Sequence, residues 1–179
     1  MRRSQPSKNS VLVLGGARSG KSAYALQRAQ EWEGQLVYLA TAEAKDEEMR
    51  QRISQHRTQR HNHRWLTIEE PIEVVWQLKE LDEDVGGVIL DCVTLWVSNA
   101  ILSNQREALE NQVAELVEEI PLFSFQFLAV SNEVGLGLVP DNPLGREYRD
   151  LLGAVNQQLA NACHEVIFMA AGLPMKLKG

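Results

Sequence analysis

Eight consecutive residues near the start of the chain could hold a nucleoside triphosphate. They fit the phosphate-loop pattern G-x-x-x-x-G-K-[ST] at every fixed position. In such a loop the backbone N–H groups surround the phosphates, the lysine reaches the β- and γ-phosphates, and the last hydroxyl binds Mg²⁺. The alternative is a glycine turn that an incidental lysine follows. We expect a catalytic Lys21, Ser22 as a metal ligand, and nucleotide contacts from the whole loop: Gly15, Gly16, Ala17, Arg18, Ser19, Gly20, Lys21 and Ser22.

Asp91 is the second candidate for metal binding. It comes at the end of an apolar run, Val88-Ile89-Leu90, that has the character of a buried strand. An acidic residue at the end of such a strand commonly holds the Mg²⁺ of a phosphate loop, directly or through water. Its alternative role is to cap the helix that follows.

His56 could act as a nucleophile. It follows Met49 and Ile53 at helical spacing, so it belongs on the inward face of a charged helix expected over residues 46–60. Arg52 and Arg60 share that face, and their positive charge would lower the pKa of the imidazole and favour its neutral form. A neutral imidazole can attack an α-phosphate and displace pyrophosphate. From spacing alone, a structural histidine is the preferred interpretation.

The elements that must position these side chains alternate along the whole chain. Apolar runs that read as strands alternate with amphipathic segments, which predicts an α/β fold with a largely parallel sheet. Ligands of such sheets bind beyond the carboxyl ends of the strands, where Ser22, Thr41, Asp91, Asn132 and Glu133 all fall. We expect strands at 11–14, 36–40, 65–68, 88–91, 125–130 and 166–170, an edge strand at 173–177, and helices after Ser22 and at 46–60, 71–81, 94–102, 106–120 and 144–162.

Length and composition limit the class of protein. The 179 residues suit a flexible tail at 1–10 and a single domain over 11–179. A net charge of −6 argues against a nucleic-acid-binding protein. The absence of a long apolar run argues against a membrane span. Two cysteines without metal-ligand spacing suit buried thiols in a reduced compartment, so we expect a cytoplasmic protein.

Several blocks of sequence, taken in order, resemble one enzyme family. The phosphate loop is followed by Ala-Thr-Ala at 40–42 and by Asp-Glu-Glu-Met-Arg-x-Arg-Ile-x-x-His-Arg at 46–57. Further on come Leu-Asp-Cys-Val-Thr-Leu-Trp-Val-Ser-Asn at 90–99, Val-Ser-Asn-Glu-Val-Gly at 130–135, and a final Gly-Leu-Pro-x-x-Leu-Lys. Together these blocks cover residues 11–178. They resemble the bifunctional adenosylcobinamide kinase and adenosylcobinamide-phosphate guanylyltransferase of cobalamin biosynthesis.

This resemblance implies an activity and a fold. Family members phosphorylate adenosylcobinamide with ATP or GTP, and then transfer GMP from GTP to the phosphate through a guanylylated histidine, which the motif places at His56. The product is adenosylcobinamide-GDP. The resemblance also implies a RecA-like P-loop fold, a homotrimer and Mg²⁺. It places nucleotide contacts beyond the loop at Ala40, Thr41, Ala42, Arg57, Thr58, Gln59, Arg60, Glu69 and Asp91.

Glu69 has a physical candidate role, because a carboxylate can accept hydrogen bonds from both the ring N–H and the amino group of guanine. The alternative is an exposed acid near a helix start. One departure from the family pattern falls at residues 60–65, where a proline is missing and one residue is added. Two other functions fit the same motifs: a monofunctional small-molecule kinase with a structural His56, and a GTP-binding switch without transferase activity.

Overall fold

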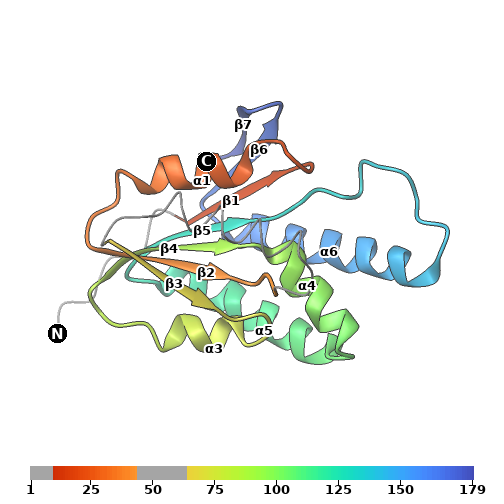
Figure 1. The fold of residues 1–179 in the computed structure, drawn as a ribbon, viewed down its shortest axis with the longest axis horizontal. Coiled ribbons are helices and arrows are strands. Elements are labelled where there is room, and N and C mark those ends of the chain that lie inside the picture. The colour runs from red at the N-terminus through yellow and green to blue at the C-terminus, as the bar shows by residue number, and fades with distance from the viewer. Residues whose placement is uncertain (1–9, 44–63) are drawn as a thin grey trace.

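The computed structural model describes residues 10–43 and 64–179, and within them seven strands form one sheet in the order β3-β2-β4-β5-β1-β6-β7. Six strands run parallel, and β7 pairs antiparallel with β6 at one edge (Figure 1). This is the mostly parallel sheet that the sequence predicts. The strands are β1 (Ser10–Gly15), β2 (Gln35–Ala40), β3 (Trp65–Glu69), β4 (Val85–Asp91), β5 (Gln126–Val130), β6 (Glu165–Ala170) and β7 (Leu173–Lys178).

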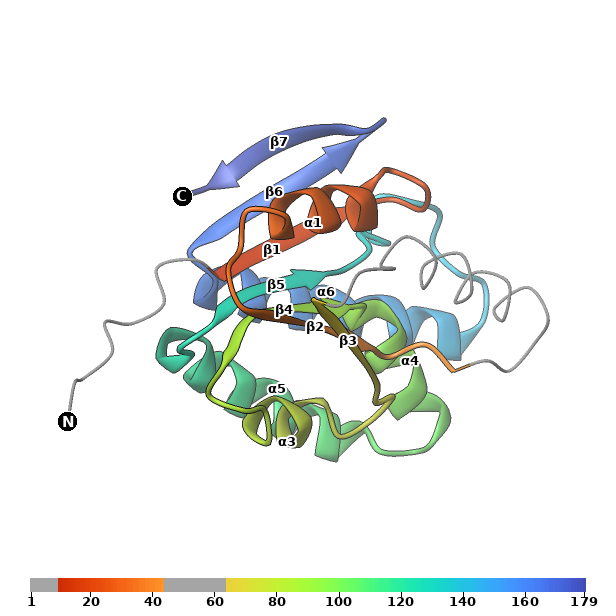
Figure 2. The same ribbon diagram turned by 60° about the vertical axis from the view of Figure 1, so that its left-hand side comes forward.

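Helices cover the two faces of the sheet unequally (Figure 2). Among the described residues, α1 (Lys21–Ala29) packs on one face through Ala25 and Ala29. The other face carries the larger core, including the fully buried Trp96. The helices on this second face are α3 (Val74–Lys79), α4 (Val93–Leu102), α5 (Arg106–Glu119) and α6 (Pro143–Ala162), and a short 3₁₀ helix, η1 (Ile120–Leu122), follows α5.

Successive side chains of a strand point to opposite faces of the sheet, and this alternation decides which side chains pack against which helices. In β4, Val88 and Leu90 face the larger core, whereas Ile89 joins the cluster around α1. Since Asp91 is two residues beyond Ile89, its side chain lies on the α1 face, which is also the face of the phosphate loop. The carboxyl ends of the parallel strands meet at one edge of the sheet, and the loops after β1, β2, β4 and β5 leave from it (Figure 1).

Several element boundaries and one predicted face differ from the expectations; β4, for example, begins at Val85 instead of residue 88. The first strand begins at Ser10, which pairs with β5 and is buried, and its hydroxyl accepts a hydrogen bond there from the His164 N–H at 2.9 Å. The helix predicted over 71–81 spans only Val74–Lys79, because the Glu70 carboxylate accepts from the N–H groups of Ile72 and Glu73 and holds a turn there.

Helical spacing along 144–162 predicts that Leu144 faces inward together with Leu151, Val155 and Leu159, and for Leu144 this prediction is wrong. Leu144 is 50% exposed, while the other three residues are buried as predicted. The first turn of α6 projects beyond the carboxyl edge of the sheet, so no strand lies under Leu144 (Figure 1). The predicted helix at 46–60 and residues 1–9 of the predicted tail at 1–10 lie outside the described residues, and the tenth residue of that tail belongs to β1 instead. None of the described helices has the length and apolar character needed to cross a membrane.

Candidate functional site

The phosphate loop joins β1 to α1 through backbone conformations that need glycine. Gly15 has φ 151° and Gly20, the residue before α1, has φ 95°. A Cβ on Gly15 would lie 2.5 Å from the Met169 carbonyl oxygen and 2.7 Å from Ser19 Oγ, so the loop has no room for a side chain there. Residues 16–18 are exposed, and Ser22 lies in the first turn of α1. The strand, loop and helix order presents N–H groups and a helix N-terminus, as phosphate binding requires.

The side chain of Lys21 folds back onto the phosphate loop and donates hydrogen bonds to it. Its Nζ donates to the Gly16 carbonyl oxygen at 2.5 Å and to Ser19 Oγ at 3.4 Å, and the residue is only 8% exposed. Burial lowers the pKa of Lys21, and the neighbouring Cys92 and Asp91 act in the opposite direction. Lys21 is the first residue of α1, and α1 packs on the face of the sheet on which Asp91 ends β4, so the two side chains interact at the carboxyl edge. The structure thus brings two predicted site residues together.

A tyrosine from the neighbouring strand orients Asp91. Tyr38 Oη donates to Asp91 Oδ2 at 2.5 Å, and Tyr38 is 4% exposed. The side chain of Tyr38 lies on the α1 face of β2, the same face as Asp91. A charge-assisted hydrogen bond of this length fixes one carboxylate oxygen and leaves the other lone pairs for a cation. Asp91 lies before α4, but no capping hydrogen bond from a side chain is present at that helix start, which favours the metal-binding interpretation.

The backbone after Asp91 is locked to the end of β2. Thr41 is fully buried, and its hydroxyl donates to the Cys92 carbonyl oxygen at 2.7 Å and accepts from the Cys92 N–H at 2.9 Å. The Thr41 N–H donates to the Asp91 carbonyl oxygen at 3.2 Å. Asn99 on α4 donates from one amide group to the carbonyl oxygens of Thr41 at 2.8 Å and Pro71 at 3.2 Å. The loops after β2, β3 and β4 are therefore fixed to one helix.

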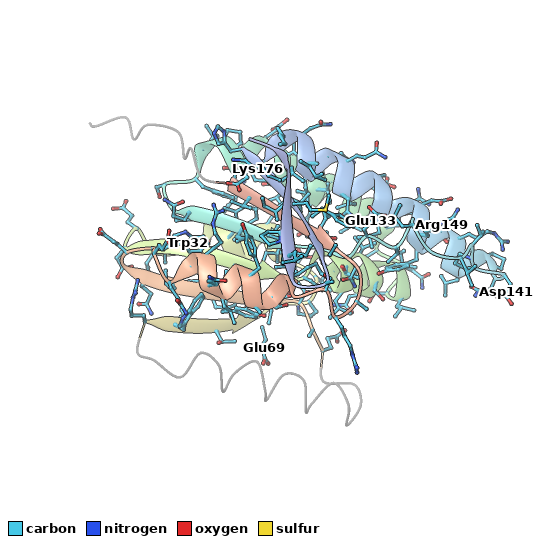
Figure 3. The ribbon with its side chains drawn as sticks, turned by 90° about the horizontal axis from the view of Figure 1, so that it is seen from above. Trp32, Glu69, Glu133, Asp141, Arg149 and Lys176 are labelled. Atoms are coloured by element: carbon cyan, nitrogen blue, oxygen red, sulfur yellow. The ribbon has the colours of Figure 1, made fainter. Side chains whose placement is uncertain are left out.

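The predicted nucleotide contacts on β2, β3 and β4 form a row along the sheet edge. Ala40 is in register with Asp91 on one side and with Glu69 on the other. Two strand spacings of about 4.8 Å put Glu69 roughly 10 Å from Asp91. Glu69 is exposed and projects from this edge of the molecule (Figure 3), whereas Ala42 is half-buried.

The donor set suits a cation that also contacts the nucleotide. Within the described ranges, no group of three or more His, Cys, Asp or Glu could hold a metal ion by itself. Ser22 and Asp91 offer a hydroxyl and a carboxylate, which are hard oxygen ligands of the kind Mg²⁺ prefers, and Mg²⁺ usually completes its shell with phosphate and water. The residues present therefore fit a nucleotide-bound Mg²⁺ better than a metal held by protein alone. Burial, reinforced by Asp91, raises the pKa of the Cys92 thiol to about 12, so this thiol stays protonated and is not a thiolate ligand.

One group of predicted residues lies outside the described residues. It comprises the proposed nucleophile His56 and the neighbouring nucleotide contacts Arg57, Thr58, Gln59 and Arg60. Their placement relative to Lys21 and Asp91 stays a prediction from sequence.

Two supporting contacts were missed by sequence reasoning. The Tyr38 hydroxyl is one, although a tyrosine within a buried strand usually needs a polar partner, and that signal was present. The other is a brace on the phosphate loop, where the Gly172 N–H in the turn between β6 and β7 donates to the Ser19 carbonyl oxygen at 3.0 Å. No local signal links Gly172 to a loop that lies about 150 residues earlier.

Known structures define the class of fold. The chain superposes on the flagellar accessory protein FlaH from Methanocaldococcus jannaschii with a TM-score of 0.54 at 14% identity, covering 97% of this chain and 79% of that one. It superposes on the RadB recombinase with a TM-score of 0.52 at 16% identity, covering 92% and 74%. Together with the phosphate loop, these likenesses show a RecA-like P-loop α/β fold.

The sequence places the chain more narrowly within that class. Residues 11–177 match the family model described as cobinamide kinase / cobinamide phosphate guanyltransferase. The bifunctional adenosylcobalamin biosynthesis protein CobP of Pseudomonas aeruginosa is 42% identical over 168 residues, covering 94% of this chain and 96% of the relative. The corresponding protein CobU of Escherichia coli is 35% identical over 188 residues, covering 94% and 99%. The chain belongs to the cobinamide kinase / cobinamide phosphate guanylyltransferase family and is a bifunctional enzyme of cobalamin biosynthesis.

Proposed function

We propose that the chain first phosphorylates adenosylcobinamide with ATP or GTP at the phosphate loop. The placement of the phosphate loop, Lys21 and Asp91 on one face of the sheet, at its carboxyl edge, is the observation that carries this proposal. The acceptor hydroxyl attacks the γ-phosphorus, the bond from that phosphorus to the β-γ bridging oxygen breaks, and the nucleoside diphosphate leaves with the electron pair. The hydroxyl proton passes to solvent.

The roles of the site residues in this step follow from their positions. Lys21 neutralises charge on the transferred phosphate, and the N–H groups of the loop hold the remaining oxygens. Ser22 and Asp91 would hold the Mg²⁺, which supplies charge neutralisation between the β- and γ-phosphates when it is bound. Tyr38 keeps the Asp91 carboxylate oriented toward the α1 face.

The second step, in this proposal, transfers GMP through His56. The imidazole nitrogen attacks the α-phosphorus of GTP, and pyrophosphate leaves with the electron pair of the broken P–O bond. A phosphate oxygen of adenosylcobinamide phosphate then attacks the same phosphorus, and the electron pair of the P–N bond returns to the ring. The product is adenosylcobinamide-GDP. The family membership supports guanylyl transfer, and the motif at 46–57 supports His56 as its carrier.

Labelling with α-³²P-GTP tests this second step. The parent protein should acquire acid-labile radiolabel, and the His56→Ala variant should acquire none while still phosphorylating adenosylcobinamide, because direct phosphoryl transfer needs no covalent intermediate. His61→Ala and His63→Ala are matched controls that should label normally. An acid-labile GMP adduct on the His56→Ala protein would show that another residue is the nucleophile. Kinase turnover in a parent that acquires no label would favour a monofunctional kinase, and binding without turnover would favour a switch.

Glu69 is proposed to select guanine. Its exposed position at the sheet edge, roughly two strands from Asp91, leaves its carboxylate accessible to a base. Glu69→Gln keeps the shape but gives up one of two acceptor oxygens, so the preference of the labelling reaction for GTP over ATP should fall about tenfold or more. Competition of ATP against α-³²P-GTP measures this preference, and an unchanged ratio would show that Glu69 is a surface acid without a role in guanine selection.

The homotrimer implied by the resemblance stays part of the proposal, and sedimentation equilibrium tests it.

A further inference from the structure

An exposed apolar surface follows β5 at the edge of the sheet where the site lies. Four large apolar side chains within nine residues are uncovered: Leu136 at 79% exposure, Leu138 at 95%, Val139 at 64% and Leu144 at 50%. We call these four residues the apolar surface. Concentrations of exposed apolar side chains of this kind mark binding sites rather than ordinary surface.

Hydrogen bonds hold both ends of the segment that carries the apolar surface. At its start, the Glu133 N–H donates to the carbonyl oxygen of Gly15, the first residue of the phosphate loop, at 3.1 Å. At its end, the Arg146 guanidinium donates to the Pro140 carbonyl oxygen at 3.0 Å, and Asn142 Oδ1 accepts from the Gly145 N–H at 2.7 Å and caps α6. The apolar surface is therefore built onto the phosphate loop at one end and onto α6 at the other.

Its position suits a large acceptor. β5 lies between β1, which leads into the phosphate loop and Lys21, and β4, which ends at Asp91. At about 3.6 Å per residue, Leu136 lies within about 11 Å of Glu133, and Leu138 within about 18 Å. The segment extends outward from the sheet, with Glu133 near the body of the molecule and Asp141 at the far end (Figure 3). The apolar surface thus begins beside the phosphate loop and continues away from it.

We propose that the apolar surface binds the corrin ring of the acceptor. This rests on the kinase activity proposed above. The acceptor is a broad macrocycle with apolar faces, and its hydroxyl is carried on a side chain. That hydroxyl must reach the γ-phosphate, but the macrocycle cannot enter the phosphate loop, so the ring needs a surface a short distance from the loop. The apolar surface starts within this distance, and Arg146, which contacts the Pro140 carbonyl oxygen next to Val139, borders it with a group that can hydrogen bond to the amides around a corrin ring.

Serine substitutions in the full chain test the inference. Leu136 and Leu138 are exposed, so Leu136→Ser and Leu138→Ser should leave the fold unchanged by circular dichroism. The double variant should raise the KM for cobinamide in the kinase reaction about tenfold or more while leaving the KM for the nucleotide within twofold, because only contact with the ring is lost. Leu122→Ser is the matched control, since Leu122 is 70% exposed and lies before β5, at the opposite edge of the sheet. Its KM for cobinamide should be unchanged.

Equilibrium binding gives a readout that does not need turnover. Binding of cobinamide, followed by its absorbance, should weaken about tenfold in the double variant and not in Leu122→Ser. If the parent binds cobinamide but does not phosphorylate it, the proposed kinase function fails and the binding comparison still decides the inference. An unchanged affinity for cobinamide in the double variant would overturn the inference. So would a loss of oligomer mass in sedimentation with cobinamide affinity retained, because the apolar surface would then be an interface between copies of the chain.

Discussion

Replacement of Thr41 by valine should remove the hydrogen bonds that fix the backbone beside Asp91. Valine has nearly the same shape but lacks the hydroxyl that bonds to both polar groups of Cys92. The loss of the hydroxyl affects the N–H and the carbonyl oxygen of Cys92 differently. The Cys92 carbonyl oxygen keeps a second bond, from the Trp96 N–H at 3.2 Å, whereas the Cys92 N–H loses its partner beside the fully buried residue 41.

The expected cost follows from this asymmetry. The lost bond to the carbonyl oxygen contributes about 1 kcal/mol, and the orphaned N–H costs about 1–3 kcal/mol. The Thr41→Val variant should therefore lose about 2–4 kcal/mol in its free energy of unfolding. Thr41→Ser is the matched control, because it keeps both hydrogen bonds and loses a single methyl group, which costs about 1 kcal/mol.

Urea denaturation followed by tryptophan fluorescence measures both variants, and Trp96 on the adjacent helix is a buried reporter. Binding of a fluorescent GTP analogue with Mg²⁺, measured while the protein is folded, should be weaker in Thr41→Val than in Thr41→Ser, because Asp91 is no longer held. A valine variant that is as stable as the serine variant, within about 0.5 kcal/mol, would refute the argument that the Thr41 hydroxyl locks this loop.

Three further predictions concern the phosphate loop and its metal. Burial lowers the pKa of Lys21 below its usual 10.5, and the negative charge of a bound triphosphate should raise that pKa again. At an alkaline pH between the pKa of the free protein and that of the complex, triphosphate binding should therefore take up a proton; calorimetry in two buffers should detect this uptake in the parent and not in Lys21→Met. Asp91→Asn should raise the Mg²⁺ concentration for half-maximal activity at least tenfold, and an unchanged requirement would remove Asp91 from the metal site. Gly15→Ala should destabilise the fold by about 1–3 kcal/mol in urea, because its Cβ meets Met169, whereas Gly16→Ala, whose Cβ meets nothing within 4 Å, should not.

The sequence predicted the parts of the site that depend on local pattern. The apolar runs gave the parallel strands, and the position of Asp91 after one of them placed it correctly at the sheet edge. The bond from Tyr38 to Asp91 was not predicted, because it joins residues 53 positions apart and depends on the register of β2 against β4. Leu144 was misplaced because helical spacing identifies an apolar face but does not show where the sheet beneath it ends.

The strand order has a consequence for synthesis on the ribosome. β1, which leads into the phosphate loop, pairs only with β5 and β6, and β6 ends at Ala170. About 155 residues must therefore be added after Gly15 before its strand has both neighbours, which takes roughly 8 to 30 s at about 5–20 residues per second. Until β5 is complete at Val130 this apolar strand has no native partner, and until β6 is complete it has only one. β1 precedes both of its partner strands in the chain by more than 100 residues, so nascent chains of this protein should need protection from aggregation and should acquire nucleotide affinity only after β6 has left the ribosome.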